Sequence, residues 1–111
     1  MRGLVSTILR GLPLVLGLSF MVCLPALADV PSASTGKAIS GMCAGCHGSK
    51  GKATNTQYPN LAGQNYQYLL EQLKNFKSGQ RSNPIMHGMT SGLSKTQMKD
   101  LAAYYSELKP R

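Results

Sequence analysis

The chain has 111 residues, and 12 Lys and Arg against 4 Asp and Glu give it a formal net charge of +8. This length is enough for one small domain. The basic residues are dispersed and match no nucleic-acid-binding motif, which excludes nucleic acid as a partner. The surplus of positive charge instead favours encounters with acidic partners.

Residues 1–28 have the pattern of a secretory signal peptide. Two arginines and no acid lie within 1–10, an apolar run covers 12–24, and a small-x-small cleavage sequence ends at Ala28. The pattern predicts cleavage after Ala28 and a periplasmic domain over 29–111. A retained membrane anchor is disfavoured, because the run is shorter than the roughly 20 residues that a spanning helix needs.

The first predicted helix starts at Ser34 or Thr35, either of which is a good N-cap. Apolar residues then recur with helical spacing as far as Cys43. This helix leads into the segment Cys43-Ala44-Gly45-Cys46-His47.

The Cys-x-x-Cys-His segment has the attachment spacing of a c-type haem. Residues i and i+3 share a helix face, so the thiols of Cys43 and Cys46 can reach both vinyl groups of one porphyrin. His47 then offers an imidazole to the iron. A covalently held cofactor would also supply the core that so short a chain lacks.

Two other uses of the cysteine pair are weaker. A zinc site needs four ligands from separated pairs, and Cys46 and His47 are adjacent. A thioredoxin-like dithiol needs a βαβ setting, and no segment alternates apolar and polar residues as a strand does.

The remaining chain predicts two further helices separated by loops. The stretch 48–63 is polar and rich in turn residues, so it is predicted to be a loop. A helix is predicted from about Gln64 to Ser78, with Gly79 as its stop. The stretch 80–92 is again predicted to be a loop, since it contains proline and two glycines.

The third helix begins at a capping box formed by Ser94 and Gln97. Its apolar stripe contains Met98, which we expect to be core filler, and it ends before Pro110. The predicted fold class is therefore all-α, with three main helices and long loops wrapped around one covalently bound haem.

The segment Asn83-Pro84-Ile85-Met86-His87-Gly88-Met89 supplies the candidates for the sixth iron ligand. A methionine thioether opposite histidine raises the haem potential, and His87 in that position would give a bis-histidine haem of lower potential. Met42 directly precedes the haem motif and cannot easily reach the opposite face of the iron.

These motifs together resemble class I cytochrome c, most closely one half of the periplasmic dihaem cytochromes and their monohaem relatives. The resemblance covers nearly all of 36–108 and rests on five segments: Cys-Ala-Gly-Cys-His-Gly, Tyr-Pro-Asn-Leu-Ala-Gly-Gln, Phe-Lys-Ser-Gly-Gln-Arg, Asn-Pro-Ile-Met-His-Gly-Met and Leu-Ala-Ala-Tyr-Tyr. It implies that Met86 is the sixth ligand, with Met89 as its rival. It also implies that the carbonyl of Pro59 accepts a hydrogen bond from His47 and so fixes the ring.

The function implied is that of an electron carrier, not an enzyme, in which haem iron cycles between Fe(III) and Fe(II). Lysines near the haem edge would steer docking to acidic surfaces of redox proteins. The resemblance implies respiratory complexes or a terminal oxidase as partners. Two alternatives stay open: a haem module with an open or exchangeable sixth site, such as a gas sensor or peroxidase, and a cytochrome subunit of a larger oxidoreductase.

Overall fold

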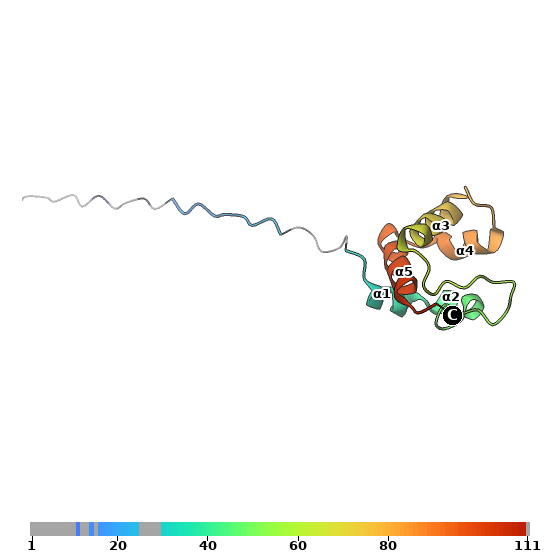
Figure 1. Cartoon of the computed structure of the whole chain (residues 1–111). Helices are drawn as coiled ribbons and strands as arrows, with labels where there is room; N and C mark the ends of the chain where they lie inside the picture. Colours follow the sequence, from blue (N-terminus) through green and yellow to red (C-terminus); the bar gives the residue numbers. More distant parts are fainter. Residues whose placement is uncertain (1–10, 12–13, 15, 25–29, 111) are drawn as a thin grey trace, which may run out of the picture.

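The computed structural model describes residues 11, 14, 16–24 and 30–110. The segment 16–24 forms neither helix nor strand and lies away from the helices (Figure 1). The predicted basic start and the cleavage site at Ala28 lie outside the described residues. Within the described parts of the chain, no helix has the length and apolar character needed to cross a membrane.

Residues 30–110 form an all-helical domain without strands, which confirms the predicted fold class. α5 packs against α1 and α3, and α3 also packs against α4 (Figure 1). The helices of this region are α1 (Ala33–Ile39), α2 (Gly41–His47), α3 (Tyr66–Ser78), α4 (Pro84–Ser91) and α5 (Lys95–Glu107).

The two long helices follow the signals read from the sequence. α3 is capped by Asn65, whose side chain accepts the N–H of Tyr68, and it stops at Gly79 in the left-handed conformation with φ 83°. α5 begins with the predicted capping box, in which the side chains of Ser94 and Gln97 each bind the other residue's backbone N–H.

The first predicted helix is divided into α1 and α2. α1 is capped by Ser32, whose hydroxyl accepts the N–H of Thr35, and not by Ser34 or Thr35. It ends at Ile39, and the hydroxyl of the C-cap residue Ser40 donates to the carbonyl of Lys37 at 2.8 Å. The haem motif therefore lies on a short helix of its own, α2.

The loop prediction for 80–92 is wrong over Pro84–Ser91, which is α4. Asn83 caps this helix by accepting the N–H of Met86 at 2.9 Å, and Pro84 occupies its first turn, where a missing N–H does no harm. As a result, Met86 and Met89 lie on successive turns of one helix.

The core lies where α5 meets its neighbours. Met98 is only 4% exposed, as expected of core filler. The buried residues of the core are Leu69, Leu70, Leu93, Met98, Leu101, Ala102, Tyr104 and Tyr105.

A buried carboxylate ties α5 to the start of α1. Asp100 is 4% exposed, and its Oδ1 accepts the backbone N–H of Ser32 at 2.7 Å. We expect Asp100→Ala to lower the free energy of unfolding by about 2 kcal/mol, because Ser32 loses a charged acceptor in a partly buried place. Denaturant titration of the haem-bearing protein measures the change. Glu107→Ala, an exposed position on the same helix, is the control, and equal losses in both variants would contradict the prediction.

Candidate haem site

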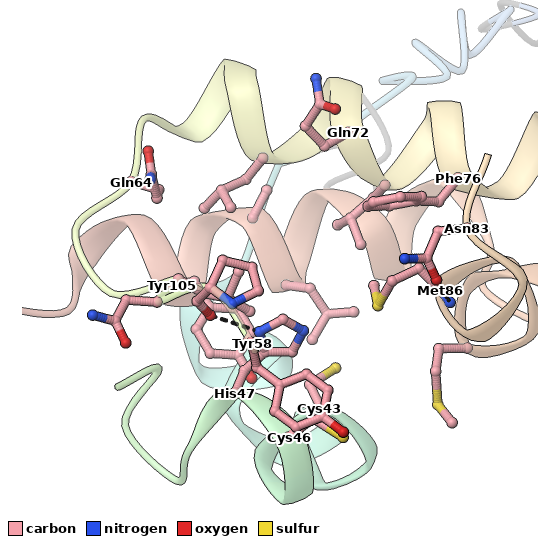
Figure 2. A pocket seen from close by; sticks show the side chains of 18 of the residues that line it. Cys43, Cys46, His47, Tyr58, Gln64, Gln72, Phe76, Asn83, Met86 and Tyr105 are labelled. Atoms are coloured by element: carbon pink, nitrogen blue, oxygen red, sulfur yellow. Dashed lines mark hydrogen bonds between the residues drawn. The ribbon is translucent and has the colours of Figure 1, made fainter. Parts of the chain in front are cut away.

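A cavity of about 430 Å³ opens among α2, α3, α4, α5 and the loop that follows α2. α2 contributes Cys43, Cys46 and His47, and α4 contributes Met86 and Met89. Figure 2 shows the two cysteines beside His47 and Met86 directed toward the same space from the other side. The structure thus gathers the candidate ligands that the sequence placed almost 40 residues apart on the chain.

The two thiols lie on one face of α2 and both line the cavity. Cys43 and Cys46 are half-buried and free of any disulfide. Burial raises the pKa of the Cys43 thiol, and a hydrogen bond with Tyr105 opposes part of this rise. Cys43 is therefore a neutral thiol at neutral pH.

His47 is held in one orientation by the loop after α2. It is 6% exposed, and its Nδ1 lies 2.8 Å from the carbonyl oxygen of Pro59 (Figure 2). Because a carbonyl only accepts, Nδ1 carries the proton and Nε2 keeps a lone pair. This is the tautomer that binds a metal through Nε2, with its ring plane set by the second hydrogen bond.

A sharp turn allows the loop to return beneath His47. Gly48 adopts φ 84°, and a Cβ there would lie 2.0 Å from the carbonyl oxygen of Lys52. Only glycine fits that backbone and that space. Farther along, the side chain of Asn60 accepts the N–H of Ala53 at 2.8 Å and closes the loop on itself.

Tyr58 is a cavity residue that the sequence reasoning did not single out. Its ring meets the His47 ring edge to face, with 6.3 Å between centroids. The signal available was its position next to Pro59, which brings it to the same side of the histidine.

Helix α4 presents both methionines to the cavity but not the histidine between them. Met86 is half-buried, and Met89 is 43% exposed. His87 does not line the cavity, and its Nδ1 lies 2.9 Å from the carbonyl oxygen of Phe76. The geometry therefore favours a thioether over His87 as the group facing His47.

The cavity wall carries almost no charge. Among the described residues that line it, Arg81 is the only lysine or arginine. Its guanidinium donates to Gln72 Oε1 at 2.7 Å and lies over the Phe76 ring at 4.5 Å from the centroid. The lysines that we expected to flank the haem edge are not among the lining residues.

A family model described as cytochrome c matches residues 33–109, which is most of the chain and includes every helix of the described residues. The chain belongs to the cytochrome c family. It is a class I cytochrome c related to the dihaem cytochromes c4. Membership sets aside the zinc and dithiol alternatives, because this family carries covalently attached haem c.

Two relatives and one solved structure illustrate the similarity. This cytochrome c is 40% identical over 77 residues to cytochrome c-554(548) of Halomonas halodenitrificans, covering 67% of this chain and 93% of that protein. It is 48% identical over 69 residues to the thiosulfate dehydrogenase electron acceptor of Thiomonas intermedia, covering 61% of this chain and 32% of that one. Reduced cytochrome c4 from Pseudomonas stutzeri superposes with a TM-score of 0.69 at 35% identity, covering 72% of this chain and 47% of that chain.

The chain thus spans about a third of the length of the Thiomonas electron acceptor and about half of the length of the solved cytochrome c4. The residues around its cavity fit a haem: a pair of thiols on one helix face, an imidazole with a free Nε2 beside them, and thioethers across an apolar space.

Proposed function

We propose that residues 29–111 form an exported electron carrier with one haem. In this proposal Cys43 and Cys46 bind the haem through thioethers, and His47 and Met86 ligate its iron. The supporting observation is the shared cavity, which brings the thiols and imidazole of α2 opposite the thioether of Met86.

Bound haem supplies one-electron chemistry by cycling its iron between Fe(III) and Fe(II). The chain's own contribution is to hold the ligands still and to exclude water. Pro59 fixes the ring of His47 through the hydrogen bond at Nδ1. Apolar side chains such as Leu69 and Leu101 form the walls of the cavity. A fixed ligand pair in an apolar cavity needs little rearrangement when an electron arrives or leaves.

Met86 is a better candidate than Met89 because it lies at the capped start of α4. Asn83 accepts its N–H at 2.9 Å, and the hydroxyl of Thr90 donates to its carbonyl at 2.8 Å. Met86 is also the more buried of the two. Two thioethers facing one cavity argue against an open sixth site, so a gas sensor or peroxidase is the weaker proposal.

The partners proposed are other redox proteins. The name of the Thiomonas relative describes an acceptor of electrons from thiosulfate dehydrogenase. We propose that this cytochrome likewise takes electrons from a dehydrogenase and passes them to a respiratory complex or terminal oxidase with an acidic docking surface. Service as one subunit of a larger oxidoreductase is the alternative, since the chain spans 32% of that relative.

One experiment tests haem attachment and export together. The full chain is expressed in a bacterial host with haem-attachment machinery, and the periplasmic fraction is purified. We expect a reduced-minus-oxidised spectrum of c-type haem, and a denatured mass equal to residues 29–111 plus one haem, with Asp29 as the first residue. Haem that separates from the denatured chain would overturn the proposal, whereas an intact leader on a haem-bearing chain would overturn only the cleavage site.

A further inference from the structure

A second cleft, lined by lysines, lies apart from the haem cavity. Its volume is about 280 Å³, and its lining consists of Leu108 and three lysines that we call the lysine cluster: Lys50, Lys52 and Lys109. No residue lines both this cleft and the haem cavity. Glu107 precedes Leu108 in the chain and is exposed, but it does not line the cleft, so no carboxylate of the described residues faces the lysines there.

The fold holds the three lysines together through backbone contacts. The carbonyl of Gly51 accepts the N–H groups of Leu61 at 2.8 Å and Ala62 at 3.0 Å. The N–H of Gly63 donates to the carbonyl of Tyr105 at 2.9 Å. These bonds fix the turn that carries Lys50 and Lys52 against the end of α5, and Lys109 lies two residues beyond that end. The fold therefore fixes the backbone positions that bring the three lysines to one cleft.

We propose that the lysine cluster is the docking surface for an acidic face of a redox partner protein. Like charges placed together without acids create a local positive field, which attracts and orients an acidic surface. Lys50 and Lys109 are exposed and Lys52 is half-buried. This exposure suits a broad contact with another protein surface. A pocket for a small anion would instead need buried donors, and the cleft has none among its lining residues.

The position of the cluster suits electron transfer and deepens the proposed function, on which this inference rests. Lys50 is three residues beyond His47, so their Cα atoms are at most about 11 Å apart. His47 and Lys50 lie at the two ends of the turn that leads into the loop bearing Pro59. A partner docked on the cluster would therefore approach from the His47 side.

The test compares two charge-reversal pairs with the same change in net charge. The first pair is Lys50→Glu with Lys52→Glu. The matched control is Lys74→Glu on α3 with Lys95→Glu, both exposed. Lys95 is the first residue of α5, whose 13 residues span about 20 Å, so it lies at the opposite end of that helix from the cluster. Each haem-bearing, reduced protein is titrated at low ionic strength with a poly-L-glutamate peptide, followed by amide chemical shifts. A further variant, Lys50→Gln with Lys109→Gln, repeats the test without altering half-buried Lys52.

We expect the cluster variants to weaken peptide binding about tenfold, and the control pair no more than about twofold. The shift changes should centre on 49–53 and 108–110, and they should fade as salt is raised, since exposed charges are screened. Equal weakening in both pairs would reduce the effect to net charge and overturn the proposal, as would shift changes centred on the haem cavity. Inorganic sulfate that shifts the same amides as strongly as the peptide would make the cleft a small-anion site. Absence of covalent haem from the unaltered protein would overturn the proposed function. The haem spectrum shows this independently of peptide binding.

Discussion

Replacing Met86 by leucine is expected to abolish the ferric sulfur-to-iron charge-transfer band. The same change should lower the midpoint potential by on the order of 100 mV, because a thioether opposite histidine favours ferrous iron. Leucine has nearly the volume of methionine, so the wall of the cavity should stay packed. The absorption spectrum of the oxidised protein and a redox titration measure the two effects.

Met89→Leu is the matched control, since Met89 lies one turn farther along α4 and lines the same cavity. We expect this variant to keep the band and to leave the potential nearly unchanged. The reverse pattern would move the ligand role to Met89. Survival of the band in both single variants would mean that either thioether can serve, which contradicts a fixed His47–Met86 pair.

Features that depend on neighbours in sequence were predictable. The capping box at Ser94 and the stop at Gly79 are local devices, in which a side chain or a left-handed backbone satisfies nearby backbone groups. The Cys-x-x-Cys-His spacing is likewise local, because one helical turn sets the distance between Cys43 and Cys46. The family resemblance extended these signals to Pro59, whose carbonyl lies within hydrogen-bond distance of His47.

Helix α4 was missed although its start signals are present. Asn83 and Pro84 form a good N-cap and first turn, but two glycines and a proline within one short stretch outweighed them in the sequence reading. The helix is stabilised by its packing against α3. Tertiary contacts of this kind leave no trace in local propensity.

The distribution of charge could not be derived from composition. A net charge of +8 suggested lysines around the haem edge, yet Arg81 is the only lysine or arginine among the described residues that line the cavity. Three of the lysines gather instead where the turn after α2 meets the end of α5, two segments more than 50 residues apart. Only the folded chain brings Lys109 to Lys50 and Lys52.

Gly36→Ala is expected to lower the free energy of unfolding by about 3 kcal/mol, the upper end of the usual penalty for overpacking. Gly36 is the buried residue of α1, where the helix crosses α5. A Cβ at this position would lie 2.0 Å from the carbonyl oxygen of Asp100 and 2.8 Å from Cβ of Tyr104. A helix backbone cannot give way as a flexible side chain can, so α1 must move off α5. Denaturant unfolding of the haem-bearing protein measures the loss.

Gly41→Ala provides the control, because a Cβ there meets nothing within 4 Å and alanine favours a helix more than glycine does. We expect its stability to be unchanged or slightly raised. The Gly36 variant should in addition disturb the haem site, since α1 leads through Ser40 directly into α2 and its haem motif. A displaced α1 would carry Cys43 and His47 with it, and the haem spectrum should then change at denaturant concentrations well below global unfolding. If Gly36→Ala is as stable as Gly41→Ala, the close crossing of α1 and α5 is not what fixes α2 in place.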